Sequence, residues 1–237
     1  GLVQEYDPET NTWSTKASMP TPRSYLALAA SGGKIYAIGG LGDGNILSKV
    51  VEEFNPVTNT WSRKADMPTA RENLMAAEVN GKIYAIGGHI KPQQEVDNVE
   101  MYNPATNTWT IKSRLQDARY SAGVAVKEGK IYVINGCSRN NVSVGTTECY
   151  APATNQWSYR KPLCNVQNNS AIHYKDRIYV FGYSNGDSVH EYNSELDYWK
   201  SKEEYEALNS VVLNMTINGD VYLIKNGTIG TYEIPYT

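Results

Sequence analysis

The sequence predicts an all-β domain built from about five copies of one repeat. The segment Gly33-Lys-Ile-Tyr-Ala-Ile-Gly-Gly40 recurs unchanged at 81–88 and returns three more times in altered form. A tryptophan that ends a second recurring segment stands at 13, 61, 109, 157 and 199, at intervals of 48, 48, 48 and 42 residues. A constant period of this length indicates structural units that pack on one another. No segment combines helical periodicity with capping residues, apart from one candidate turn at 202–208.

Each repeat is predicted to form four short antiparallel strands. In the first complete repeat, residues 26–30 and 34–38 are apolar on both faces, as expected for inner strands covered on both sides, and Ser31-Gly-Gly33 supplies the turn between them. Residues 50–54 alternate in polarity and form the third strand. The segment Asn55-Pro-Val-Thr-Asn59 then provides a turn into a fourth strand that carries Trp61.

One such sheet cannot cover both of its own faces, so the repeats are expected to pack face to face around an axis as a β-propeller. The recurring Trp, Tyr and Gly residues are then framework. We expect a single domain over residues 1–237, closed by pairing of the N-terminal and C-terminal strands. The closing repeat then has one strand in excess, because both ends of the chain carry a strand of the third position. The predicted repeats are about 18–65, 66–113, 114–160, 161–202, and 203–237 closing with 1–17.

The repeat resembles the kelch repeat. The Gly-Gly doublet, the Tyr-Asp-Pro turn, the tryptophan and the segments Met19-Pro-Thr-Pro-Arg23 and Met67-Pro-Thr-Ala-Arg71 carry the resemblance, which extends over nearly the whole chain and weakens beyond about Leu163. The repeat sequence is closest to that of bacterial kelch arrays and is also similar to the kelch domains of ubiquitin-ligase substrate adaptors. Because kelch propellers more often have six blades, the alternative to five closed blades is an incomplete six.

The connections between second and third strands diverge most between repeats, and loops on a rigid scaffold commonly carry binding sites. Arg23, Arg71 and Arg119 occupy one equivalent position before the first strand. Similarity to the ligase adaptors implies that these arginines form a ring that grips acidic peptides, and guanidinium groups suit carboxylates. The ring is incomplete, because Val166 and Asn209 occupy the position in the last repeats. The alternative is that the arginines pin the loops by donating to backbone carbonyls.

Neighbouring aromatic and polar residues complete the predicted binding surface, which is assigned to one end face. The predicted ligand-binding residues are Arg23, Tyr25, Arg71, Asn73, His89, Arg119, Tyr120, Arg139 and Asn168.

The leading functional prediction is a non-catalytic scaffold that binds a protein or peptide, with an acidic segment as one candidate ligand. His89, His173 and His190 fall in different repeats without metal-ligand spacing, so no catalytic residue, metal or cofactor is predicted. Two alternatives stay open. One is a carbohydrate-binding or cell-surface module, because 18 tyrosines could stack on sugars. The other is a kelch-type sugar-processing enzyme such as a sialic-acid epimerase, whose scattered polar site residues leave no local motif.

Charge and hydropathy narrow the choice of partner. A net charge of −3 and a pI near 5.7 give no long-range attraction to nucleic acid. No apolar run approaches the ~20 residues of a membrane-spanning helix, so we expect a soluble protein without membrane insertion. The propeller is also expected to be monomeric. The compartment is left open, with the cytoplasm preferred over secretion or the cell surface. The sequence begins with Gly1, so flanking domains are also left open.

Overall fold

The computed structural model describes residues 1–91, 94–164, 166–183 and 187–201, and the backbone of three later strands at 211–217, 220–225 and 228–232. Two three-residue 3₁₀ turns are the helical segments among these residues. No helix in the described part of the chain is long and apolar enough to cross a membrane. The chain divides into two compact units, residues 1–112 and 113–237, close to the predicted boundary between two repeats.

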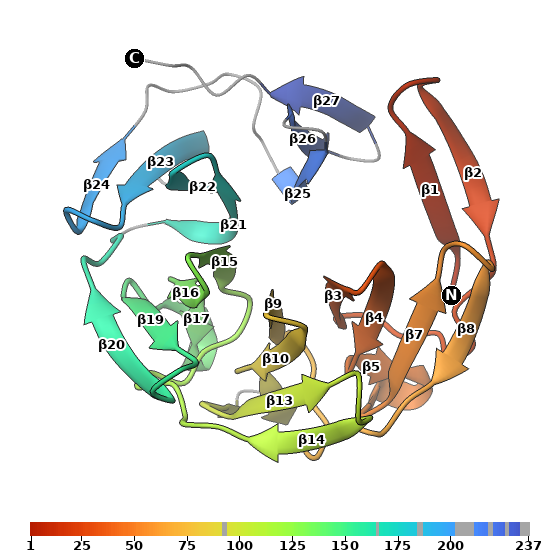
Figure 1. Cartoon of the computed structure of the whole chain (residues 1–237). Coiled ribbons are helices and arrows are strands. Elements are labelled where there is room, and N and C mark those ends of the chain that lie inside the picture. Colours follow the sequence, from red (N-terminus) through yellow and green to blue (C-terminus); the bar gives the residue numbers. More distant parts are fainter. Residues whose placement is uncertain are drawn as a thin grey trace. The chain divides into compact units, whose positions relative to one another are not determined.

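Unit 1 contains two complete four-stranded antiparallel sheets, β3-β4-β7-β8 and β9-β10-β13-β14, and the two-stranded sheet β1-β2 (Figure 1). Its main strands are β1 (Val3–Asp7), β2 (Thr12–Lys16), β3 (Ala27–Ser31), β4 (Lys34–Ile38), β7 (Val51–Asn55), β8 (Thr60–Arg63), β9 (Met75–Val79), β10 (Lys82–Ile86), β13 (Val99–Asn103) and β14 (Thr108–Ile111). The four strands predicted for each repeat are therefore confirmed, in sequential order within each sheet.

The core of unit 1 lies between its two complete sheets, where β3 packs against β9. Ile83 and Ala85 of β10 are fully buried there, and the rings of Tyr36 and Tyr102 meet at 5.8 Å between centroids. Each fully buried large apolar side chain contributes about 1.5–3 kcal/mol. The inner strands are apolar on these facing sides because each of the two sheets covers the other.

Unit 2 repeats the same sheet twice, as β15-β16-β19-β20 and β21-β22-β23-β24, and adds the three-stranded sheet β25-β26-β27. Its main strands are β15 (Gly123–Lys127), β16 (Lys130–Ile134), β19 (Thr147–Ala151), β20 (Gln156–Arg160), β21 (Gln167–Tyr174), β22 (Arg177–Tyr183), β23 (Asp187–Asn193), β24 (Tyr198–Ser201), β25 (Val211–Ile217), β26 (Asp220–Lys225) and β27 (Thr228–Tyr232). Strand β15 packs against β21 as β3 packs against β9.

The recurring tryptophan and the asparagine two residues before it join one repeat to the next. Asn59 Oδ1 accepts a hydrogen bond from the backbone N–H of Ala17 at 2.8 Å, and the Trp61 indole donates to the carbonyl of the same residue at 2.8 Å. Three further residues are held in the same way, Ala65 by Asn107 and Trp109, Ser113 by Asn155 and Trp157, and Lys161 by Asp197 and Trp199. These contacts confirm the predicted framework role for four of the five tryptophans, at 61, 109, 157 and 199.

The described strands make four complete sheets. The fifth predicted repeat is divided between β1-β2 in unit 1 and β25-β26-β27 in unit 2.

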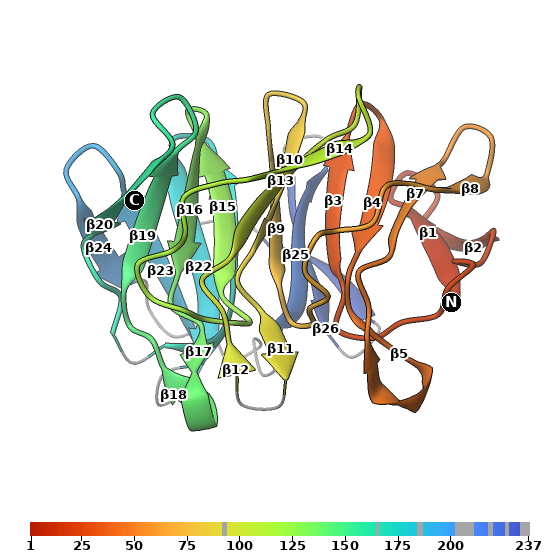
Figure 2. The same ribbon diagram turned by 90° about the horizontal axis from the view of Figure 1, so that it is seen from below.

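Small hairpins that were not predicted follow the second strand in three repeats and extend past the ends of the sheets (Figure 2). They are β5 (Leu41–Gly42) with β6 (Ile46–Leu47), β11 (His89–Lys91) with β12 (Gln94–Glu95), and β17 (Cys137–Ser138) with β18 (Val142–Ser143). Gly40 starts the first of them at φ 100°, where a Cβ atom would lie 2.6 Å from the carbonyl oxygen of Ser24. Only glycine allows this close approach of two backbones.

Candidate functional site

An arginine that recurs in three repeats is buried between the second and third strands, next to the small hairpin. The Arg71 side chain has no exposed surface, and its Nη1 donates to the carbonyls of Gly87 and Asn98 at 3.0 Å each. Its Nη2 donates to Glu100 Oε2 at 2.8 Å. Burial lowers the pKa of Arg71, and the Glu100 carboxylate opposes this shift. The guanidinium therefore joins the end of the second strand to the start of the third.

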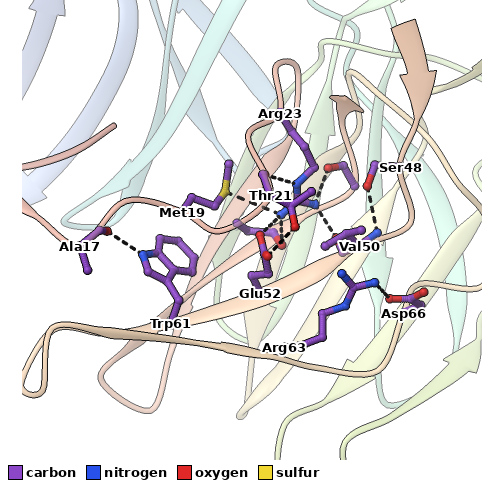
Figure 3. A network of polar contacts seen from close by, with 12 residues as sticks. Ala17, Met19, Thr21, Arg23, Ser48, Val50, Glu52, Trp61, Arg63 and Asp66 are labelled. Carbon is purple, nitrogen blue, oxygen red and sulfur yellow. Dashed lines mark hydrogen bonds and ion pairs between the residues drawn. The ribbon is translucent and has the colours of Figure 1, made fainter. Parts of the chain in front are cut away.

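Arg23 and Arg119 make the same contacts. Arg23 donates to the carbonyls of Gly39 and Val50 and to Glu52 Oε2, at 2.7, 2.6 and 2.9 Å (Figure 3). Arg119 donates to the carbonyls of Asn135 and Thr146 at 2.9 Å and to Glu148 Oε1 at 2.5 Å. Each guanidinium thus satisfies two backbone carbonyls and one buried carboxylate.

The buried glutamates also hold the loop that precedes the first strand. Glu52 Oε1 accepts from Thr21 Oγ1 at 2.7 Å, and Glu100 Oε1 accepts from Thr69 Oγ1 at 2.6 Å. Glu148 accepts instead from the backbone N–H groups of residues 116 and 117. These are the contacts of the backbone-pinning alternative. In place of the predicted exposed grip on a ligand, the structure shows an arginine already paired, and a ligand carboxylate would have to displace a buried glutamate to reach it.

The fourth repeat shows what accompanies loss of the ion pair. Val166 takes the position of Arg71, and His190 takes that of Glu100, and both are buried. Tyr183 stands where the other repeats have the glycine that turns the chain away. Here β22 and β23 stay paired as far as Tyr183 and Asp187, beyond the point where the strands separate in the other repeats. The arginine, the glutamate and the glycine are therefore the residues that go with a small hairpin.

Each small hairpin is fixed to the loop before the first strand by two backbone hydrogen bonds. Ser24 and Leu41 exchange bonds of 2.9 and 2.7 Å, and Glu72 and His89 exchange bonds of 3.1 and 2.8 Å. Tyr120 and Cys137 form the equivalent bridge in unit 2, at 3.0 and 2.9 Å. The backbone geometry is therefore the same in three repeats.

In unit 1 the two hairpins and the loops between them form one continuous surface, because the N–H of Asn73 donates to the carbonyl of Tyr25 at 2.9 Å. We call this the hairpin surface and define it as residues 24–25, 41–47, 72–73, 89–91 and 94–95. Figure 2 shows its two hairpins at the same end of the unit-1 sheets.

Side chains on this constant backbone differ from repeat to repeat. Tyr25, Asn73 and Ser121 are equivalent, and all three have left-handed backbones, with φ of 54°, 51° and 50°. Asparagine adopts this conformation readily, whereas a bulky residue there is costly by about 1–2 kcal/mol. Tyr25 is nevertheless 60% exposed. Its ring is held outward on a strained but well-fixed loop.

The structure places the other predicted site residues in different environments. Asn73 and His89 lie half-buried on the hairpin surface, where burial lowers the pKa of His89 and the nearby Glu72 and Glu95 carboxylates oppose this. Tyr120 is buried, and its hydroxyl donates to Asn141 Oδ1 and so packs the third hairpin. Arg139 is exposed in the turn of that hairpin. The side chain of Asn168 lies outside the described residues.

Two groups of surface residues were missed from the sequence. Ile46 and Val142 occupy equivalent positions in two hairpins and are 69% and 58% exposed. Ser121, not Tyr120, is the equivalent of Tyr25, as the 48-residue period applied strictly would have shown. Among the described residues there is no group of three or more His, Cys, Asp or Glu side chains placed to hold a metal ion.

Comparisons with known proteins agree with this architecture. A 39-residue stretch is 49% identical to alpha-scruin of Limulus polyphemus, and the match spans 16% of this chain and 4% of that protein. The structure reported as "Structure of YjhT" superposes with a TM-score of 0.80 at 17% identity, covering 98% of this chain and 86% of that one. This likeness shows the fold, an all-β propeller of antiparallel sheets.

The family model of the KLHDC2/KLHL20/DRC7 Kelch-repeats domain matches residues 3–183. That match covers more than half of the chain and includes all the small hairpins described above. The chain therefore belongs to the family of the KLHDC2/KLHL20/DRC7 Kelch-repeats domain.

Proposed function

We propose that this chain is a non-catalytic scaffold that binds a protein or peptide through its hairpin surface. One observation carries the proposal: three small hairpins share the same pair of backbone hydrogen bonds, while the residues at those bonds are Ser and Leu, Glu and His, and Tyr and Cys. A fixed backbone with changing side chains is the arrangement by which a rigid scaffold presents a recognition surface.

Tyr25 is the proposed anchor of this surface. Its ring is 60% exposed, and neither a hydrogen bond nor a ring contact engages it among the described residues. Tyrosine is enriched among residues that dominate binding energy, since its ring buries a large area and its hydroxyl adds a directional hydrogen bond. The fixed backbone sets the direction in which the side chain leaves the loop, so no backbone ordering is needed on binding.

The buried arginines alter the proposed chemistry of the partner. Glu52, Glu100 and Glu148 already neutralise the three guanidiniums. The partner proposed for the hairpin surface is therefore not required to be acidic.

For the whole chain we propose one monomeric domain of five blades, closed by pairing of its N-terminal and C-terminal strands. Asn11 has the left-handed backbone of the other joining asparagines, at φ 54°. Trp13, however, is 48% exposed, and its indole N–H has no partner among the described residues. Both residues are therefore available for the pairing that would close the domain.

Selection of a random peptide library displayed on phage tests the binding proposal. Enriched peptides, made synthetically, are expected to lose at least about tenfold in affinity when Tyr25→Asn is introduced, a change of about 1.4 kcal/mol. The variant should fold normally, because asparagine tolerates the backbone of that position. Val57→Asn is the matched control, since Val57 is 91% exposed in the turn between β7 and β8.

The proposal fails if no peptide is enriched, or if Tyr25→Asn and Val57→Asn bind the enriched peptides equally well. A parallel glycan array covers the carbohydrate alternative, and specific glycan binding without peptide binding would replace the proposal.

A further inference from the structure

The second hairpin of unit 1 places two carboxylates in one row. Glu72, in the loop before β9, exchanges backbone hydrogen bonds of 3.1 and 2.8 Å with His89 of β11. His89 in turn faces Glu95 of β12. Residues that face each other across antiparallel strands project to the same side, with Cβ atoms about 4.5–5.5 Å apart. The side chains of Glu72, His89 and Glu95 therefore lie side by side, with the histidine in the middle.

These two carboxylates are not part of the repeated framework. The framework glutamates, at 52, 100 and 148, recur in three repeats and pair with the buried arginines. The row at the second hairpin has no such recurrence, although the backbone bridge is the same in all three hairpins. Its equivalents are Ser24, Leu41 and Leu47 in the first repeat, and Tyr120, Cys137 and Ser143 in the third. An acidic row is therefore not needed to build a small hairpin.

The hairpin surface as a whole is anionic. Asp43, Glu72 and Glu95 provide three carboxylates, against one ammonium group on Lys91. His89 adds little positive charge at neutral pH, because burial lowers its pKa despite the adjacent carboxylates. The arginines beside the two hairpins do not offset this charge, since each is paired with a buried glutamate. A partner that approaches the surface therefore meets a negative potential.

Tyr25 lies next to the acidic row. The N–H of Asn73, the residue after Glu72, donates to the carbonyl of Tyr25 at 2.9 Å, and the Tyr25 side chain is 60% exposed. Cations bind over the face of a tyrosine ring, and arginine does so more often than lysine. The ring and the carboxylates are two independent features that attract the same kind of group.

We propose that the partner of the hairpin surface is a basic peptide segment, whose arginine or lysine side chains pair with Glu72 and Glu95 and stack on the ring of Tyr25. This inference rests on the proposed function, because it names the chemistry of the ligand for the same surface. Arginine suits the role well, since its planar guanidinium carries five N–H donors and also stacks on aromatic rings.

The sequences of the peptides selected from the random phage library test this chemistry separately from binding itself. Selection on the wild-type chain is expected to enrich arginine and lysine over aspartate and glutamate at least about threefold, relative to the unselected library. Failure to enrich any peptide would refute the proposed function. Enriched peptides that are acidic or uncharged, and that lose affinity with Tyr25→Asn, would leave the proposed function intact and overturn the basic partner.

A double-mutant cycle on an enriched arginine peptide tests whether the carboxylates meet its cation. Glu72→Gln and Glu95→Gln are each expected to weaken binding about two- to fivefold, and more at low salt, since contacts between partly exposed charges are modest and screened. A peptide with citrulline in place of arginine keeps the shape without the charge, so it should bind the wild type and both variants with equal affinity. Glu9→Gln, which removes an exposed carboxylate in the turn between β1 and β2, is the control and should change neither affinity.

Two results of this cycle would overturn the proposal. One is an arginine peptide that binds the wild type, Glu72→Gln and Glu95→Gln equally well, because its cation would then lie elsewhere. The other is a citrulline peptide that loses as much affinity as the arginine peptide, because the glutamates would then act through packing and not through charge. Thermal unfolding identifies a variant that is misfolded, and the other carboxylate then carries the test.

Discussion

At the scale of single residues, the main feature is a buried arginine that is paired within its own repeat. Arg71, Arg23 and Arg119 each lose their hydration, and this loss is offset by a carboxylate and two carbonyls at hydrogen-bond distance. Such a pair adds little net stability compared with an apolar pair of the same shape, but removal of one partner is costly, since it leaves the other charge buried. The ion pair therefore serves mainly to fix the geometry at the point where the second and third strands separate.

Arg71→Ala is expected to lower the free energy of unfolding by about 3–5 kcal/mol, because Glu100 remains buried without its cation. The double variant Arg71→Val with Glu100→His copies the pair that the fourth repeat carries at these positions, Val166 and His190. It should be more stable than Arg71→Ala alone. Urea unfolding measures all three proteins, and a loss below about 1 kcal/mol for Arg71→Ala would contradict the role given to the pair.

Histidine burial predicts how stability depends on pH. Burial lowers the pKa of His190, whose Nε2 has no hydrogen-bond partner in the described structure. The unfolded chain then takes up the proton more readily than the folded one, so the contribution of this residue is complete above its ordinary pKa near 6.5 and is lost as the pH falls below it. The free energy of unfolding should therefore decline between pH 7 and pH 5.

His190→Gln should make this decline shallower, by about 1.4 kcal/mol for each unit of pKa shift. His89→Gln is the comparison, since burial lowers the pKa of His89 as well, against the opposing Glu72 and Glu95 carboxylates. Equal pH profiles for wild type and His190→Gln would show that His190 is not protonated on unfolding in this range.

At the scale of elements, the small hairpin depends on two backbones that approach where a side chain would not fit. Gly88 has φ 102°, and a Cβ atom there would lie 2.7 Å from the carbonyl oxygen of Glu72 and 2.9 Å from the Cβ of Leu74. Gly40 and Gly136 show the same contacts in the other two hairpins. The approach brings Glu72 against His89 and so fixes the hairpin to the loop.

Gly88→Ala should destabilise the protein well beyond Gly81→Ala. Both glycines have positive φ, so both substitutions carry the cost of about 1–2 kcal/mol for a left-handed backbone. Only Gly88 adds a steric overlap, since no atom lies within 4 Å of a Cβ at Gly81. Overpacking of this kind costs about 1–3 kcal/mol more. Thermal unfolding compares the two variants, and equal melting temperatures would mean that the close approach relaxes without cost.

For the whole molecule, the repeat period predicts the four strands and the framework tryptophans because these depend on contacts that recur at a fixed interval. Trp61 and Asn59 are read correctly for this reason. The period could not decide between the two roles of Arg23. Its partner is a buried glutamate 29 residues later in the chain, and nothing in the sequence sets Glu52 apart from the adjacent Glu53. The hairpins were missed because their strands are only two or three residues long.

Tyr25 shows why the binding surface could be predicted only in part from the sequence. Its identity suggested a contact residue, but its left-handed backbone and exposure follow from Gly40 and from the bridge between Ser24 and Leu41, which no local pattern reveals. Comparison of Tyr25 with Asn73 and Ser121 in strict register comes closest, since two of the three residues suit a left-handed backbone or a turn.

The central claim is that the ligand binds at the hairpin surface, and amide hydrogen exchange with a selected peptide bound tests it most directly. Slower exchange is predicted at residues 24–25, 41–47, 72–73 and 89–91, with no change at the turns 56–59 and 104–107, which connect β7 to β8 and β13 to β14. Protection confined to those turns, with the hairpins unaffected, would contradict the account.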